Sequence, residues 1–303
     1  MTRIFSFFQS LAVIVPLSVS ADTIELSDGR IFHGGLAGSV GGYLSIIVGD
    51  SNNQAELRYR LDEIERIEFS DSISRQDAID GFSKRHPSES TALLENLALK
   101  RLPYLELLSP EDESIFTYLL ESYILTGRAV DALERAKLWL SKLSSSEAKL
   151  RGQELQIIAA WNLDRPSESA YYGRQWIEAG KSCQTSALPW VTLANIALME
   201  DDYETALWIA LNPIVFSPPS RPPYLEEAYA IAIISAFKTG ERALAHQLKS
   251  EMRDLEFVLP KNFRWSAPLA DADRQSEDGS RTENRSNQFK RNANPIFKLI
   301  GKP

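Results

Sequence analysis

The sequence predicts a multidomain α+β chain, in which a small β-barrel-like domain precedes a mainly α-helical solenoid. Short alternating runs, separated by Gly and Asp turn signals, fill residues 22–72. Apolar residues take a helical spacing from residue 73 onward. Within residues 111–259 the sequence pattern repeats with a period of roughly 36 to 39 residues, which is typical of stacked helical hairpins.

The composition indicates a folded chain with an acidic balance. Of the 303 residues, 44% are hydrophobic and 24% are charged, which excludes a wholly disordered chain. The net charge of −8 argues against nucleic acid as the main partner, because phosphate binding requires a basic surface. The single cysteine, Cys183, excludes an intrachain disulfide and a cysteine-rich zinc site, and we interpret it as a small packed residue.

Residues 1–21 have the three parts of a cleavable secretory signal. A short positive start containing Arg3 precedes a mostly apolar run over 4–19, and small residues precede Asp22. The run is shorter than a membrane span and is interrupted by polar residues, so we expect no integral membrane span. We expect cleavage after Ala21 and export, to the periplasm if the source is a Gram-negative bacterium. The alternative is an uncleaved anchor.

Residues 22–72 alternate strand and turn signals. We expect strands over five segments: 23–26, 30–37, 43–48, 56–60 and 65–69. Asp28-Gly29 is typical of a tight hairpin turn, and the Gly-rich residues 38–42 are expected to form a loop. Residues 61–64 are expected to form one helical turn. So many short strands in one small segment predict a small barrel.

The turns of this region follow a definite order. Leu26-x-Asp28-Gly29-Arg30 is followed by a Gly-rich bend and then by a closing Ile64-x-x-Ile67-x-Phe69. That order resembles SH3-like and Sm-like small barrels. Sm-like proteins often bind RNA, but the segment has no basic patch. We therefore expect a docking or oligomerisation module and no nucleic acid.

Two partial motifs in this region are incomplete. Gly35-x-x-Gly38-x-x-Gly41 lacks the Gly-Lys-Ser/Thr that completes a phosphate loop, and the segment starting at Asp50 lacks the Gly and Glu of a calcium loop. We expect no cofactor and no metal.

Residues 73–110 change to a helical period. A short helix is expected over 74–84 and ends before Pro87, and a second helix begins at Ser88 or Ser90 and stops or bends at Pro103. Its apolar stripe consists of Leu93, Leu94, Leu97, Leu99 and Leu102. We interpret this region as a helical connector that covers the end of the array that follows.

Residues 111–259 contain related ladders of large and small residues. The clearest copy is Trp190-x-x-Leu193-Ala194-x-x-Ala197-x-x-x-Asp201-x-Tyr203-x-x-Ala206-x-x-x-Ala210, and others begin at Phe116, Ile157 and Tyr229. These ladders resemble the tetratricopeptide repeat; another α-solenoid is the alternative. The resemblance implies helical hairpins whose second helices pack closely through four small residues: Ala132, Ala170, Ala206 and Ala245. Gly127 and Gly240 allow tight turns within the hairpins, whereas Arg165 departs from that pattern.

The resemblance also implies a concave groove. Its first helices would present nine residues to that groove: Thr117, Glu121, Leu155, Ala159, Val191, Asn195, Ala230, Ile234 and Lys238. Because the set is mostly apolar, we expect an apolar or amphipathic peptide or helix as the ligand, not a carboxylate terminus. The alternative is that Leu155, Val191 and Ile234 pack against the neighbouring repeat.

Residues 260–303 lose the repeat pattern. The polar segment from Asp271 to Asn294 is expected to be disordered. An apolar cluster then follows: Pro295, Ile296, Phe297, Leu299 and Ile300. We interpret the cluster as a candidate docking motif for a partner or for the protein's own groove, with a frayed tail as the alternative.

Catalytic motifs are absent from the sequence. No His-Glu-x-x-His, Gly-x-Ser-x-Gly or Cys-x-x-Cys occurs, and the three histidines are far apart in the chain. The acidic clusters 111–113 and 201–202 are expected at helix starts or turns, where carboxylates are usually solvated. We therefore expect no catalytic residue and no enzyme.

The sequence as a whole predicts an exported, non-enzymatic adaptor that joins proteins of the cell envelope through its groove and its C-terminal tail. Self-association through the β-domain is a further option. The alternatives are a peptidoglycan- or glycan-binding module that uses Tyr43 and Tyr59, and, less favoured, a wall-active hydrolase.

Overall fold

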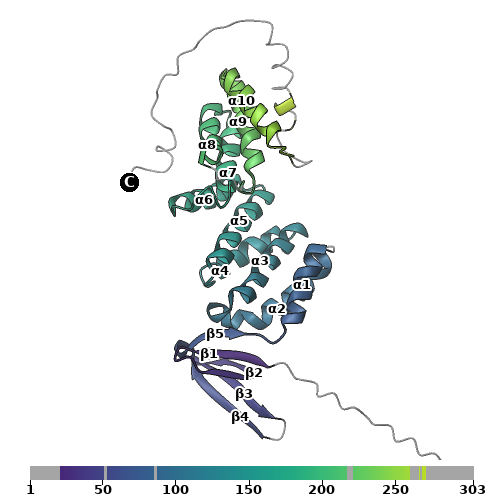
Figure 1. The fold of residues 1–303 in the computed structure, drawn as a ribbon, viewed down its shortest axis with the longest axis vertical. Coiled ribbons are helices and arrows are strands. Elements are labelled where there is room, and N and C mark those ends of the chain that lie inside the picture. The colour runs from purple at the N-terminus through teal and green to yellow at the C-terminus, as the bar shows by residue number, and fades with distance from the viewer. Residues whose placement is uncertain are drawn as a thin grey trace, which may run out of the picture.

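The computed structural model describes residues 21–50, 53–84, 87–216, 221–259, 266 and 268–270. A small antiparallel sheet lies at one end of the elongated molecule, and helical hairpins follow it one after another (Figure 1). Residues 1–20 of the predicted signal segment 1–21, the polar segment 271–294 and the apolar cluster at 295–300 lie outside the described residues. In the described part of the chain, every helix is too short or too polar to cross a membrane.

The sheet contains the five expected strands. They are β1 (Asp22–Leu26), β2 (Ile31–Val40), β3 (Tyr43–Asp50), β4 (Asn53–Arg60) and β5 (Ile64–Glu68). Strand β2 continues to Val40, so only Gly41 and Gly42 of the expected loop 38–42 form the turn. The short turn η1 (Leu61–Glu63) precedes β5, as predicted. The strand order is β4-β3-β2-β1-β5, with every neighbouring pair antiparallel.

The sheet is open, so the predicted closed barrel is wrong. Strands β4 and β5 form its two edges and do not pair with each other. The reason lies at β5, where a parallel bridge joins Ile67 to Leu108 of the helical region. This contact covers the edge that would have met β4, and the β3–β4 hairpin extends away from the helices instead (Figure 1).

Alternating apolar residues build the inner face of the sheet. Ile24, Leu44 and Ile46 are completely buried, and all belong to one core that continues into the first helices. Strands β2 and β3 approach so closely that a Cβ added at Gly34 would lie 2.2 Å from the carbonyl oxygen of Ile47. Glycine is therefore required at this position.

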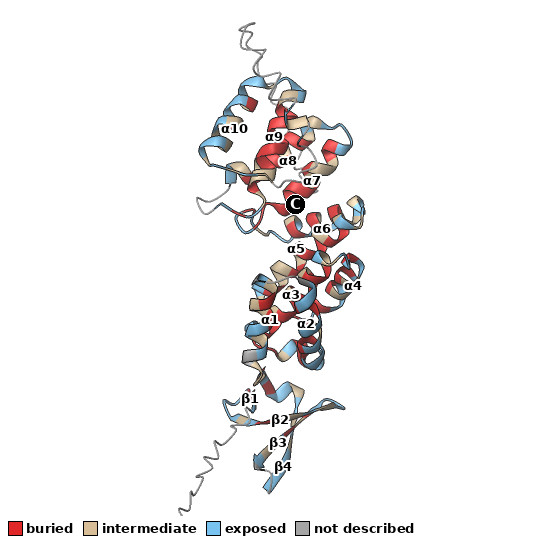
Figure 2. Ribbon diagram, turned by 90° about the vertical axis from the view of Figure 1, so that its right-hand side faces the viewer, coloured by how far each residue is buried: buried red, intermediate tan, exposed pale blue. Residues whose placement is uncertain are grey.

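The remainder is helical, and consecutive helices contact each other as antiparallel pairs. The elements are α1 (Ser72–Lys84), α2 (Pro87–Arg101), the 3-10 segment η2 (Leu102–Leu107), α3 (Pro110–Leu125), α4 (Ala129–Trp139), α5 (Ser146–Asn162), α6 (Pro166–Glu178), α7 (Leu188–Met199), α8 (Tyr203–Phe216), α9 (Leu225–Thr239) and α10 (Arg242–Asp254). Helix α3 also contacts α5, α5 contacts α7, and α7 contacts α9. Buried residues follow these contacts, whereas α10 is largely exposed (Figure 2).

The small residues of the hairpins follow the predicted pattern, and so do the turns except the one after α5, where the left-handed residue is Asp164 and not Arg165. Ala132, Ala170, Ala206 and Ala245 are at most 2% exposed, in the second helix of each pair. Gly127 and Gly240 take φ values of 77° and 86° after α3 and α9. The equivalent turns after α5 and α7 contain Asp164 and Asp201, with φ values of 55° and 57°. Aspartate tolerates this left-handed backbone better than most side chains.

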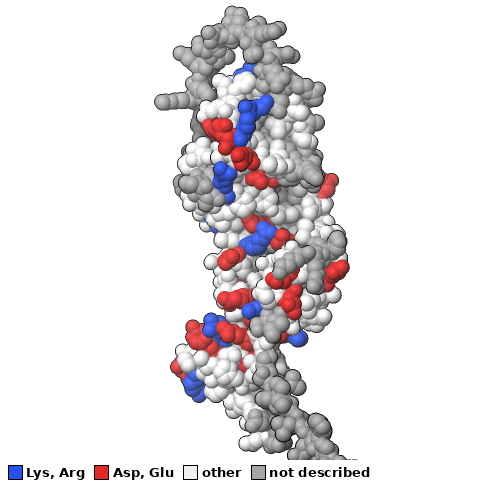
Figure 3. Space-filling model, turned by 45° about the vertical axis from the view of Figure 1, so that its right-hand side comes forward, with Lys and Arg blue, Asp and Glu red and all other residues white. Residues whose placement is uncertain are grey.

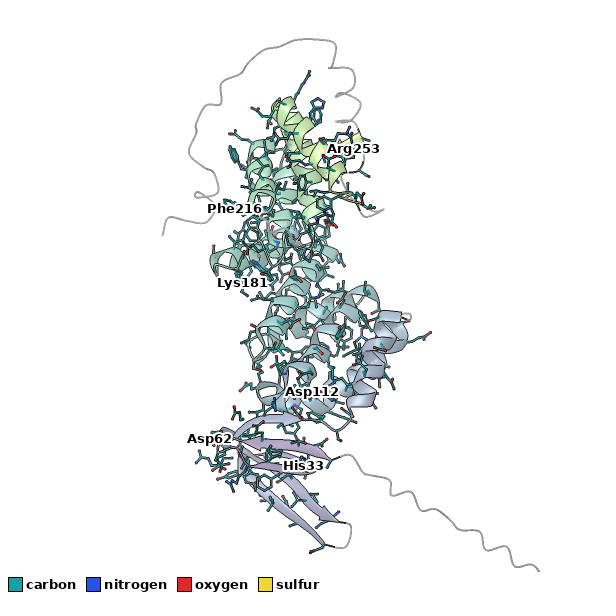
Figure 4. All side chains as sticks on the ribbon, in the orientation of Figure 1. His33, Asp62, Asp112, Lys181, Phe216 and Arg253 are labelled. Atoms are coloured by element: carbon teal, nitrogen blue, oxygen red, sulfur yellow. The ribbon has the colours of Figure 1, made fainter. Side chains whose placement is uncertain are left out.

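A buried arginine joins the sheet to the helices. Arg101, at the end of α2, is fully buried; its Nε donates to Asp112 Oδ1 over 2.8 Å, and its guanidinium also binds Asp71. Its Cζ lies 4.4 Å from the ring centroid of Phe69, which follows β5. Arg75 of α1 adds a second bond to Asp112 at 3.1 Å. Four segments therefore meet at one ionic cluster, where Figure 4 labels Asp112.

The acidic cluster 111–113 corrects one sequence-based expectation. It lies in the first turn of α3 as predicted, but Asp112 and Glu113 are fully buried, not solvated. Glu113 accepts hydrogen bonds from the Ser144 amide (2.6 Å), the Ser144 hydroxyl (2.6 Å) and the Ser145 amide (2.8 Å). Burial is tolerated because these donors replace water. Asp201 and Asp202 are exposed, as expected.

We predict that Arg101→Met lowers the free energy of unfolding by about 3 kcal/mol or more, because loss of one partner leaves buried carboxylates under-compensated. Urea unfolding followed by circular dichroism measures the change. Arg165→Met is the matched control, since Arg165 makes an exposed pair with Glu168, and its cost should stay below about 1 kcal/mol. Equal losses in the two variants would contradict the prediction.

Candidate functional site

An open cleft of about 830 Å³ lies along helices α1, α3 and α5. Its far end is completed by Trp176 of α6 and by the loop residues Thr185 and Pro223. The first helices of successive hairpins thus form one continuous wall, because α3 and α5 contact each other directly. A cleft of this size and openness suits a peptide segment or an extended small molecule.

Arg151 organises the polar part of the cleft. Its guanidinium donates to Glu121 of α3 and to Glu154 of its own helix α5, at 2.9 Å in each case. Burial alone would lower the pKa of Arg151, but the hydrogen bonds and charges of the two glutamates outweigh it and raise the pKa. The pair with Glu121 therefore ties α3 to α5 along the cleft wall.

The cleft has an acidic charge balance. Its lining includes Arg75 and Arg151, and the glutamates outnumber these arginines: Glu111, Glu121, Glu147 and Glu154. Glu111 and Glu147 are exposed, in the first turns of α3 and α5. Acidic and basic side chains are interspersed over the face shown in Figure 3. Such a cleft favours a ligand that carries basic groups.

Apolar side chains line the rest of the cleft. Ile79 of α1, Tyr118 of α3 and Leu150 of α5 are half-buried, so each still presents surface to the cleft. Tyr118 is held by an edge-on contact with Phe82, with ring centroids 5.6 Å apart. The cleft can therefore cover apolar side chains of a ligand while its glutamates contact basic ones.

Two of the predicted groove residues line this cleft. They are Thr117, whose hydroxyl donates to the Ser114 carbonyl, and Glu121, the partner of Arg151. Asn195 is half-buried on α7, and Lys238 is exposed on α9 with its Nζ 5.8 Å from the ring centroid of Tyr203. Neither lines the cleft.

The remaining five predicted residues are buried between helices. Leu155, Ala159, Val191, Ala230 and Ile234 are at most 5% exposed. They are therefore packing residues, in agreement with the alternative interpretation, and their surfaces do not face a ligand. The cleft in the structure is consequently more polar than the groove that the sequence predicts.

Most residues of the cleft are not predicted by the sequence pattern. Ile79 lies on α1, in the region interpreted as a connector, and Arg151 had no repeat position assigned. The spacing of Arg151 and Glu154 is typical of a helical ion pair, which is the one local signal available. Glu121 lies 30 residues earlier, and only the packing of α3 on α5 brings it to Arg151.

The aromatic residues proposed for glycan binding differ in exposure. Tyr43 is 48% exposed beside Val40, which is 83% exposed, at the tip of the β2–β3 hairpin. Tyr59 is half-buried on β4 and packs on Phe32, with ring centroids 5.1 Å apart. Only Tyr43 therefore offers an open aromatic surface.

The histidines and the cysteine lie in separate parts of the fold. His33 Nδ1 is 3.1 Å from Thr23 Oγ1 on the sheet, His246 packs on Phe237 in the last hairpin, and His86 lies outside the described residues. Cys183 is 6% exposed, and burial raises the pKa of its thiol, as expected for a packed residue. Within the described ranges, no three His, Cys, Asp or Glu side chains form a metal-binding group.

Comparisons with known proteins provide no relative from which a function can be transferred. No family model, curated protein or solved structure matches the chain. The residues of the cleft and of the sheet are therefore the basis for a functional proposal.

A carboxyl group with a buried oxygen atom lies at the start of α9, four residues after the cleft residue Pro223. Glu227, in the first turn of α9, has an Oε2 atom without a hydrogen-bond partner among the described residues. Burial raises its pKa from 4.5 to about 7, and the nearby charge of Glu226 adds to the shift. Burial raises the pKa of Tyr224, and the charges of Arg151 and Glu154 from the cleft and of Glu227 all act on this residue.

We predict that Glu227 makes stability fall as the pH rises from about 4.5 to 7. In this window the folded chain keeps a proton on Glu227 and the unfolded chain releases it, so deprotonation favours unfolding. Glu227→Gln should remove about 2 kcal/mol of the stability difference between pH 4.5 and 8. Urea unfolding at several pH values measures this difference. Glu226→Gln is the control and should retain most of the slope; an unchanged slope in Glu227→Gln would refute the prediction.

Proposed function

We propose that this protein is an exported, non-enzymatic adaptor that binds a protein partner of the cell envelope in the cleft along α1, α3 and α5. The observation that supports the proposal is the cleft itself, an acidic, partly apolar channel of about 830 Å³ formed by successive helical hairpins. The occupant we propose is an amphipathic segment with apolar and basic side chains. Apolar groups cover Ile79 and Leu150, and basic groups approach Glu111 and Glu147.

A tetratricopeptide-like stack is the finer architecture that we propose for the helical region. Contacts from α3 to α5, from α5 to α7 and from α7 to α9 support it, because first helices line the inner face of such a stack. The buried alanines of the second helices support it as well. The apolar residues 295–300 stay in the proposal as a second docking element.

Glycan binding is the second candidate, supported by the exposed Tyr43 beside Val40. A hydrolase has weaker support. Glu121 and Glu154 lie close together in the cleft, but both bind Arg151. A hydrolase needs two carboxyl groups that are free to contact the scissile bond, and both of these carboxylates are held in ion pairs with Arg151.

We predict that reversing the exposed charges of the cleft weakens the binding of basic amphipathic peptides. The probe is a random dodecapeptide library displayed on phage and selected against residues 22–303. Enriched peptides should combine Lys or Arg with aliphatic or aromatic residues. The double variant Glu111→Lys/Glu147→Lys should bind synthetic copies of these peptides at least about tenfold more weakly, as measured by isothermal titration calorimetry, because two attractive charges become repulsive.

The matched control for this experiment is Glu89→Lys/Glu204→Lys. Both residues are exposed glutamates in first turns, of α2 and α8, and neither lines the cleft. The control protein should bind the peptides like the wild type. Peptides that bind all three proteins equally, or a library without enrichment, would argue against the cleft as the binding site.

A further inference from the structure

Strand β4 is an uncovered edge of the sheet. All eight of its residues pair with β3 in one unbroken register, from Tyr43 opposite Arg60 to Asp50 opposite Asn53. Six of the eight residues are exposed, and only Leu57 and Tyr59 are partly buried. The opposite edge, β5, is covered at Ile67 by Leu108. Free backbone groups are therefore concentrated on the β4 side.

Two of the devices that protect a sheet edge, proline and β-bulges, are missing from β4. The strand contains no proline, and its pairing with β3 has no bulge, whereas the β1–β5 and β2–β3 pairs have register shifts. A long, regular and exposed edge is a template for another strand. Charged residues alone remain to control which strand can pair there.

The backbone alternation of β4 identifies its free groups. The amide of Leu61 donates to the carbonyl of Gly42 over 3.0 Å, and these residues continue the β3–β4 register. Antiparallel strands bond at every second residue, so Leu57 and Tyr59 also bond inward to β3. The amides and carbonyls of Glu56 and Arg58 therefore face outward.

We propose that two copies of this chain pair through β4, antiparallel and centred on Leu57. A two-fold axis normal to the sheet relates the two copies and keeps each side chain on the same face of the sheet. Residues directly opposite each other share a face, so the axis must pass between one residue and the same residue of the second copy. The symmetric pairing is therefore centred on one residue. Centring on Leu57 places Glu56 of each copy opposite Arg58 of the other. The outward backbone groups of Glu56 and Arg58 then meet as hydrogen-bonded pairs.

Charge complementarity favours this register over the two adjacent ones. Centring on Glu56 would place two glutamates opposite each other, and centring on Arg58 would place two arginines opposite each other. Like charges directly across a strand pair destabilise it, whereas opposite charges stabilise it. Within one chain, Arg58 already binds Glu56 over 2.9 Å in an exposed pair. Pairing two copies would join two such ion pairs into one four-charge network.

The other face of the strand also gains from this register. Leu57 would lie opposite its own copy, and Ala55 would lie opposite Tyr59. Leu57 is only half-buried and Ala55 is exposed in the single chain, so apolar surface is available to cover. The dimer would carry two clefts, one on each copy, along helices α1, α3 and α5. These helices lie away from β4 (Figure 1).

Charge reversal tests the register directly. Residues 22–303 are studied by sedimentation velocity up to about 100 µM, where an interface of modest size should be populated. The wild type should sediment as a dimer. Glu56→Arg places Arg opposite Arg, and Arg58→Glu places Glu opposite Glu. The dimer dissociation constant of each single variant should therefore be at least about tenfold higher than that of the wild type.

Mixing the two single variants is the decisive measurement. An equimolar mixture of Glu56→Arg and Arg58→Glu restores opposite charges at both positions and should form a heterodimer. The double variant Glu56→Arg/Arg58→Glu should dimerise like the wild type. Glu65→Arg on β5 is the control for an exposed charge reversal, and circular dichroism confirms folding of each variant.

Three outcomes would overturn the proposal. One is a wild type that stays monomeric throughout the concentration range. Another is dimerisation unaffected by either single reversal, which would place the interface elsewhere. The third is a mixture of the single variants that stays monomeric although the wild type dimerises, since that would exclude the register centred on Leu57.

Discussion

The buried guanidinium of Arg101 is the interaction on which the rest of the structure depends. A charge removed from water must be compensated on all sides, and Arg101 obtains this compensation from Asp71, Asp112 and the ring of Phe69. Phe69 and Asp71 belong to the segment that follows β5, and Asp112 lies in the first turn of α3. The position of the sheet and the direction of the α3–α4 hairpin are therefore set by the same group.

The same cluster extends into the cleft. Arg75 binds Asp112 and also lines the cleft, so the wall formed by α1 is anchored at the junction with the sheet. One residue further along α3, Glu113 holds the loop before α5 through three hydrogen bonds. Buried carboxylates thus fix the spacing of α3 and α5, and Arg151 joins these helices again at Glu121. The shape of the cleft follows from ionic contacts as much as from apolar packing.

The proposed binding surfaces lie at different places in the fold and use different chemistry. The cleft offers side chains, with an acidic rim over a partly apolar floor. The β4 edge offers backbone hydrogen-bonding groups, with Glu56 and Arg58 selecting the register. Because β5 and η2 separate the sheet edge from the hairpins, occupation of one surface need not alter the other. An adaptor that dimerises through β4 would therefore present two clefts to its partners.

The sequence by itself determined the local structure. Alternation and Asp-Gly turns predicted the five strands, and recurring alanines and glycines predicted the packing and turns of the hairpins, because these features depend on neighbours a few residues apart. Tertiary structure alone decided that the sheet stays open, that Asp112 and Glu113 are buried, and that Leu155 and Ile234 pack inside instead of lining a groove. Each of these outcomes depends on a partner far away in the chain. Hydrophobic periodicity shows which face of an element is buried, but it does not show which distant charge or strand edge will lie against it.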